Sequence, residues 1–135
     1  MHILVIVTPT PGFESDTTRC QVIQGELERR LAAPLAATFE AVSYLREVEH
    51  FISAADLVLM YFHQSWLSKP KHPTTLDGFD ILEYLSKAEK RYVVLTQSNM
   101  GRRHERIADN AHVLSFDEGS LDELMAKIVL FATKE

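Results

Sequence analysis

The feature that most constrains the fold is a set of short, uninterrupted apolar runs. Residues 3–7, 57–62 and 92–95 are apolar at every position. A strand with one face in water alternates apolar and polar residues, so continuous runs indicate strands that are covered on both faces. Together with two weaker segments, they predict five strands, at residues 2–8, 38–42, 56–62, 91–96 and 111–116.

The segments between these strands have helical periodicity. Ser15 or Asp16 is expected to cap the first helix. The apolar face of that helix is formed by Cys20, Ile23, Leu27 and Leu31. We interpret Cys20 as a small core residue rather than a nucleophile. Further helices are predicted near residues 45–55, 79–89, 102–108 and 120–131.

Strands and helices therefore alternate along the whole chain, which predicts an α/β fold. Parallel neighbours in a sheet need crossover helices, and these crossovers are right-handed, so helices cover both faces. We expect one domain over residues 1–135, with a doubly wound, five-stranded parallel sheet in the flavodoxin-like order 2-1-3-4-5. In such sheets ligands bind beyond the carboxyl ends of the strands.

Charge and composition exclude several classes of protein. The formal net charge is −5, which counts against nucleic-acid binding because phosphate neutralisation needs basic residues. No apolar run reaches the roughly 18 residues that span a bilayer, so we expect no membrane association. The first residues resemble a strand rather than a signal peptide. A single cysteine, Cys20, permits no internal disulfide, and we expect a reducing, cytoplasmic location.

Residues 63–76 form an unusually long predicted loop, and loops of this length inside a compact domain are often functional. Trp66 stands in it beside Leu67, among proline, lysine and serine residues. The side chain of Trp66 either packs over the domain as a lid or is presented to a protein partner, where tryptophan is a favoured anchor.

Several segments resemble the receiver domains of bacterial response regulators. The resemblance lies in residues 76–85, 92–96 and 121–128, and in Asp56-Leu57-Val58-Leu59-Met60, which resembles the start of the family's third strand. It covers about residues 45–130, and it implies the CheY-like form of the α/β fold.

The resemblance also implies which parts of the family's chemistry are absent. Val7 and Thr8 stand where receivers carry two metal-binding acids, and Tyr61 stands at the position of the phosphoacceptor aspartate. Residues 115–118 contain no counterpart of the family's lysine, whereas Thr96 matches its Thr/Ser switch position. Magnesium binding and aspartyl phosphate formation both need carboxylates here, so we expect no metal and no cofactor.

The resulting hypothesis is a pseudo-receiver, a regulatory domain that acts by protein–protein interaction without phosphorylation. The binding residues of its degenerate phosphorylation pocket are predicted to be Thr8, Tyr61, Thr96 and Ser115. Its interaction residues are predicted to be Trp66, Arg102, Arg103 and Arg106. The partner is either another protein or a second copy of the chain, whose acidic residues the arginines would meet.

An alternative hypothesis is a nucleoside- or nucleotide-processing enzyme. Deoxyribosyltransferase-like and TIR-like folds place a catalytic glutamate on a helix in a comparable region, which here would be Glu83 beneath Trp66. A carboxylate there could act in acid–base or nucleophilic catalysis. The simpler interpretation is that Glu83 belongs to a solvated helix face.

A third hypothesis is flavin binding. Residues 8–18 are rich in hydroxyl groups and precede a helix, as in a flavodoxin phosphate loop. Two prolines in this segment lack N–H donors, and two acids in it repel phosphate, so an ordinary connecting loop remains the simpler interpretation.

Overall fold

The computed structural model describes residues 2–7, 14–32, 35–42, 44–61, 78–96, 112–115 and 120–133. The predicted loop at residues 63–76 and the predicted short helix at residues 102–108 lie outside these ranges. The described elements alternate as expected. The strands are β1 (His2–Val7), β2 (Ala36–Ala41), β3 (Leu57–Tyr61), β4 (Tyr92–Thr96) and β5 (His112–Ser115). The helices are α1 (Glu14–Arg30), α2 (Leu45–Ser53), α3 (Gly78–Lys87) and α4 (Leu121–Thr133).

All five strands join one parallel sheet in the order β2-β1-β3-β4-β5. The predicted fold class and strand order are therefore confirmed. The central strands β1 and β3 are buried almost throughout, as their uninterrupted apolar runs require of strands that are covered on both faces.

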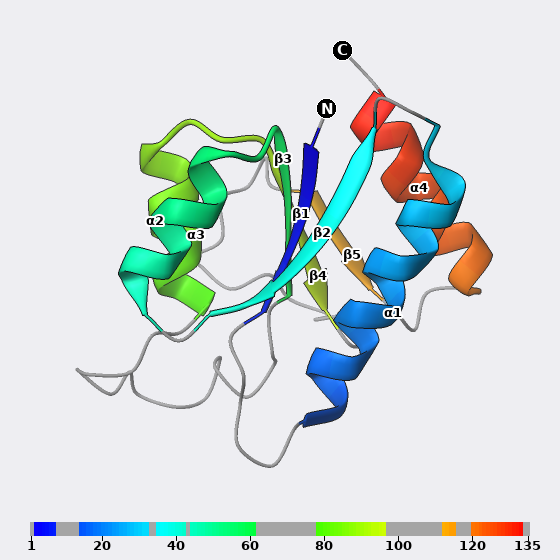
Figure 1. Ribbon diagram of the computed structural model, residues 1–135, viewed down its shortest axis with the longest axis horizontal. Helices are drawn as coiled ribbons and strands as arrows, with labels where there is room; N and C mark the ends of the chain where they lie inside the picture. Colours follow the sequence, from blue (N-terminus) through cyan, green and yellow to red (C-terminus); the bar gives the residue numbers. More distant parts are fainter. Residues whose placement is uncertain are drawn as a thin grey trace.

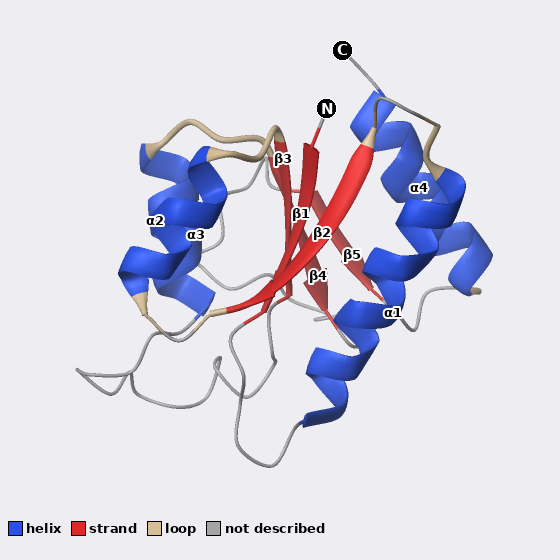
Figure 2. Ribbon diagram, viewed as in Figure 1, coloured by secondary structure: helices blue, strands red, loops and turns tan. Residues whose placement is uncertain are grey.

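The helices cover both faces of the sheet in pairs, with α1 and α4 on one side and α2 and α3 on the other (Figures 1 and 2). Successive side chains of a strand point to opposite faces. Leu57, Leu59 and Tyr61 accordingly pack in the layer of α1 and α4. Val58 and Met60 pack in the layer of α2 and α3. These two groups are called the α1/α4 layer and the α2/α3 layer below.

Local signals explain where two of the helices begin. The predicted cap of the last helix is confirmed, because the backbone N–H of Glu123 donates to Oγ of Ser120 at 3.2 Å. At the start of α2 the backbone N–H of Tyr44 donates to Oε1 of Glu47 at 3.1 Å. Each contact satisfies a backbone donor that the helix leaves without an intrahelical partner.

Among the described residues, no helix combines the length and the apolar character that crossing a bilayer requires.

Candidate functional site

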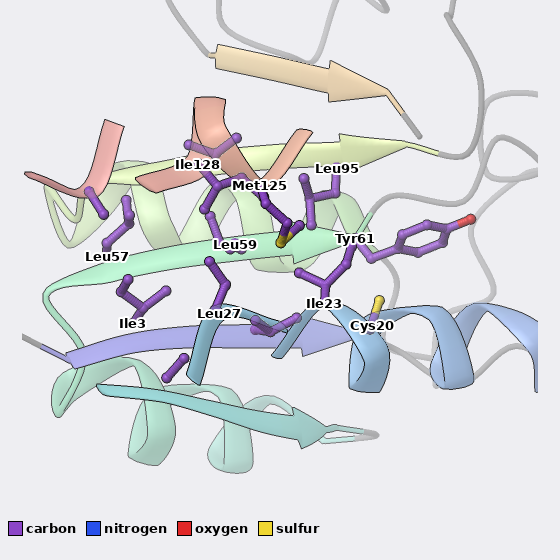
Figure 3. Packing of buried hydrophobic residues seen from close by; sticks show 14 of the residues in the cluster. Ile3, Cys20, Ile23, Leu27, Leu57, Leu59, Tyr61, Leu95, Met125 and Ile128 are labelled. Atoms are coloured by element: carbon purple, nitrogen blue, oxygen red, sulfur yellow. The ribbon is translucent and has the colours of Figure 1, made fainter. Parts of the chain in front are cut away.

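Tyr61 ends β3 at the carboxyl edge of the sheet, and its side chain lies in the α1/α4 layer. The residue is only 1% exposed. Its ring extends past the end of the strand, on the side where α1 carries Cys20 (Figure 3). The phenolic hydroxyl donates a buried hydrogen bond of 3.0 Å to Oδ1 of Asp16. The end of β3 is therefore occupied by an aromatic ring that is hydrogen-bonded to a carboxylate.

Asp16 lies in the first turn of α1 and is 4% exposed. The expectation that Ser15 or Asp16 caps this helix is wrong, since α1 already begins at Glu14. Asp16 precedes Cys20 by four residues, so both side chains share the inward face of the helix. The carboxylate also lies at the amino end of α1, where the helix dipole favours negative charge.

Cys20 is 0% exposed, which confirms that it is a core residue. Burial, together with the negative charge of Asp16, raises the pKa of its thiol to about 12. The same two causes raise the pKa of the Tyr61 hydroxyl well above its ordinary value. Both groups therefore stay protonated at neutral pH, so neither is prepared as a nucleophile.

The other two described pocket residues, Thr96 and Ser115, are partners in the register of β4 and β5. Both are buried, and Oγ1 of Thr96 donates to the carbonyl oxygen of Leu114 at 3.5 Å. Tyr61 pairs with Leu95 across β3 and β4. Because side chains alternate, Thr96 points to the sheet face opposite Tyr61.

Ser115 also points away from Tyr61, because the preceding residue, Leu114, packs in the α1/α4 layer. The structure thus brings Thr96 and Ser115 together at one edge of the sheet but directs Tyr61 to the other face. Thr8 lies outside the described residues, and the binding role of these four residues remains a prediction.

Glu83, the glutamate of the enzyme hypothesis, is exposed on α3. Since α3 covers the α2/α3 face (Figure 1), Glu83 lies on the opposite side of the sheet from the Tyr61 ring. Its predicted companion Trp66 lies outside the described residues. So do the three arginines of the predicted interaction surface, Arg102, Arg103 and Arg106.

Within the described part of the chain, no group of three histidine, cysteine or acidic side chains could hold a metal ion. The acid that reaches the end of β3 is Asp16 of α1, which already accepts a hydrogen bond from Tyr61. A magnesium ion prefers near-octahedral coordination by oxygen ligands. A buried negative charge at this point also repels phosphate. The chemistry that this arrangement supports is structural hydrogen bonding.

Comparison with known proteins found no matching family model and no matching curated protein. The sheet order is that of the CheY-like and flavodoxin-like folds, and the likeness rests on this architecture.

Sequence reasoning did not predict that Asp16 is a buried residue of the site. A signal for it exists. The apolar face of Cys20, Ile23 and Leu27 continues back by one turn to position 16, so an acid stands on a stripe that faces the core. An acid on such a stripe predicts a buried polar contact rather than a helix cap.

Proposed function

We propose that this chain is a receiver-like regulatory domain that acts through protein–protein contact and carries out no phosphoryl transfer. The observation that carries the proposal is the hydrogen bond between Tyr61 and Asp16. The two hydrogen-bonded side chains occupy the end of β3, where a phosphorylated receiver would need an accessible aspartate.

Two requirements of phosphoryl transfer are unmet at this position. An aspartyl phosphate forms on a carboxylate next to a magnesium ion, whereas Tyr61 offers a protonated hydroxyl that is 1% exposed. The pKa of this hydroxyl is raised by burial and by Asp16, which opposes formation of the nucleophilic phenolate. Since the fold alone does not determine function, the proposed role is assigned to the surface of the domain.

The test is incubation of the full chain with acetyl phosphate and Mg²⁺, followed by intact-mass measurement. We expect no gain of a phosphoryl group. In parallel, beryllofluoride with Mg²⁺ is expected to leave the melting temperature where Mg²⁺ alone or fluoride alone leaves it.

A Mg²⁺-dependent phosphoryl adduct, or a clear thermal shift with beryllofluoride, would overturn the proposal. The Asp16→Asn variant then identifies the group involved. If the response disappears in this variant, Asp16 is the acceptor or the metal ligand. If it persists, the reacting group lies elsewhere in the chain.

A further inference from the structure

The strand β2 (Ala36–Ala41) has a neighbour on one side only within the described sheet. It stands at the end of the order β2-β1-β3-β4-β5, and β1 pairs with it along its whole length (Figure 1). The other side of an edge strand presents backbone N–H and C=O groups, which can pair with a strand of another chain. Proteins commonly block this side, so a stretch that stays open points to a partner.

Two sets of contacts show which backbone groups of β2 face away from β1. The N–H of Val42 donates to the carbonyl oxygen of Val7 at 2.9 Å, so the backbone groups of Val42 face β1. The N–H and C=O groups of Ala37 bond instead to side chains of α1. Backbone groups of successive residues in such a strand point to alternate sides. Those of Phe39 and Ala41 therefore point outward, like those of Ala37.

Helix α1 blocks the outward side of β2 at Ala37. Nε2 of Gln24 donates to the carbonyl oxygen of Ala37 at 2.8 Å, and the N–H of Ala37 donates to Oε1 of Glu28 at 3.4 Å. Within the described part of the chain, no hydrogen bond reaches the outward backbone groups of Phe39 or Ala41. Ala41 is exposed, and Phe39 is half-buried. The stretch 38–42, which follows the blocked residue, is called the open edge below.

The side chains of the open edge define the chemistry of a matching strand. Phe39 packs in the α1/α4 layer and Val42 in the α2/α3 layer, so the half-buried Glu40 projects on the α2/α3 side. Among the described residues, no cation forms an ion pair with Glu40. A residue directly beside Glu40 in an added strand has its side chain on the same face and within reach. A basic residue is therefore favoured beside Glu40, and an apolar residue beside Phe39.

A second copy of β2 matches the open edge poorly. Within the bounds of β2, two antiparallel, two-fold registers pair both Phe39 and Ala41. One register has its axis at Glu40, so the two copies of Glu40 face each other, and like charges in this position are destabilising. The other register has its axis at Phe39 and sets Ala41 of each copy against the blocked Ala37 of the other. Both features oppose self-pairing and favour a different chain.

We propose that the open edge of β2 binds an extended segment of another protein, which adds to the sheet as a further strand. The segment carries a basic residue beside Glu40 and an apolar residue beside Phe39. In strand addition, main-chain hydrogen bonds give affinity, and alternate side chains give specificity. This inference rests on the proposed interaction role, for which it names the surface and the chemistry of the partner, and it uses neither Tyr61 nor Asp16.

Peptide binding tests the proposal. The probe is a short, labelled peptide of alternating valine and lysine with blocked ends, titrated with the full chain and measured by fluorescence anisotropy. Two further peptides carry backbone N-methyl groups, one on its valines and one on its lysines. Only one of these two keeps the N–H groups that face β2, so we expect their dissociation constants to differ at least about tenfold. Equal affinities would show attraction by charge alone and would overturn the proposal.

Two variants of the chain test the surface. Ala41→Pro deletes an outward N–H but no hydrogen bond to β1, and proline is tolerated in this position of an edge strand. It is expected to weaken binding of the unmethylated peptide about tenfold. Glu40→Lys is expected to weaken binding of the lysine peptide and to favour a peptide of alternating valine and glutamate. Glu49→Lys on the exposed face of α2 makes the same change in net charge and should alter neither affinity.

Amide hydrogen exchange, measured by NMR, locates the bound peptide. The outward N–H groups of Phe39 and Ala41 are expected to exchange more slowly when the unmethylated peptide is saturating, because they then donate to its carbonyl groups. The N–H of Leu95, in the interior strand β4, should show no change. Protection that appears elsewhere in the chain, with none at Phe39 and Ala41, would contradict binding at the open edge.

The failure of this inference can be told apart from the failure of the proposed function. A chain that binds none of the peptides, or that binds them equally well after Ala41→Pro and Glu40→Lys, overturns the inference. Self-association that Ala41→Pro abolishes also overturns it, because the occupant would then be a second copy. None of these results bears on the phosphodonor experiment. A phosphoryl adduct in that experiment would defeat the proposed function, even if the peptide binds at the open edge.

Discussion

The two layers that flank the sheet handle buried polarity differently. In the α2/α3 layer the described core is apolar, and neutral hydroxyls of Thr96 and Ser115 lie buried at the strand ends. In the α1/α4 layer the core encloses a carboxylate, Asp16, hydrogen-bonded to Tyr61 and close in sequence to a buried thiol. A neutral hydroxyl is satisfied by nearby carbonyl groups, whereas a buried acid needs a dedicated donor. We therefore expect substitutions near Asp16 to be coupled to one another.

The largest effects on stability should come from β3, the strand whose side chains pack into both layers. Leu59 and Met60 are consecutive residues of β3, both are 0% exposed, and they point into opposite layers. Leu59→Ala and Met60→Ala are each expected to lower the free energy of unfolding by about 2–5 kcal/mol, measured by urea denaturation. A loss below about 1 kcal/mol for either variant would show that its layer is not closely packed.

Removal of a phenolic hydroxyl should lower the free energy of unfolding more in the α1/α4 layer than in the α2/α3 layer. Tyr61→Phe deletes the hydrogen bond to Asp16 and is expected to lower the free energy of unfolding by about 1–3 kcal/mol. Tyr92→Phe is the matched control, because Tyr92 is half-buried against the α2/α3 layer. Its change should stay within about 0.5 kcal/mol. Equal effects of the two variants would remove the distinction between the layers.

The buried thiol of Cys20 predicts that the natural chain and a variant without this thiol differ in stability at alkaline pH. The pKa of Cys20 is about 12 in the folded chain against an ordinary value of 9.0, so the folded state holds this proton more tightly than the unfolded state. The resulting stabilisation is complete below pH 9.0 and declines as the pH rises toward about 12. Urea titrations on both sides of pH 9.0 should show a steeper loss of stability for the natural chain than for Cys20→Ala.

Asp16→Asn sharpens this prediction, because burial is the larger cause of the shift and the charge of Asp16 the smaller one. The decline of stability with pH should therefore become less steep in this variant without disappearing. An unchanged profile in Cys20→Ala would show that the thiol does not contribute, and an unchanged profile in Asp16→Asn would show that the charge does not reach it.

The smallest effect should come from the surface of the α1/α4 layer. Nη2 of Arg30 lies 2.5 Å from Oδ1 of Asp122 and joins α1 to α4, but the Asp122 side chain is 82% exposed. Asp122→Asn is expected to lower the free energy of unfolding by only about 0.2–1 kcal/mol, and less at high salt. Glu49→Gln on the exposed face of α2 is the control. A loss as large as that of Tyr61→Phe would contradict this ranking.

The sheet was predictable from sequence because its evidence is local. The run from Leu57 to Tyr61 is apolar at every position, and alternation with helices leaves few topologies for parallel strands. Cys20 was placed correctly by helical spacing for the same reason.

The candidate site was harder to predict because it depends on the first residue of one helix and on the register of two strands. Sequence patterns locate both poorly. Asp16 becomes a buried residue only if α1 starts before it, and it starts at Glu14. The grouping of Tyr61 with Thr96 depends on strand register. Tyr61 pairs with Leu95, so Thr96 falls on the opposite face. Register between strands that are distant in sequence is set by packing of the whole domain.

The central claim is that Tyr61 and Asp16 form a structural pair rather than a reaction site. A double-mutant cycle of Tyr61→Phe and Asp16→Ala, read as free energies of unfolding, measures their interaction most directly. The account predicts a favourable coupling of about 0.5–3 kcal/mol, the range for residues in contact. Effects of the two substitutions that add to within about 0.3 kcal/mol would contradict it, because the phenol and the carboxylate would then not depend on each other.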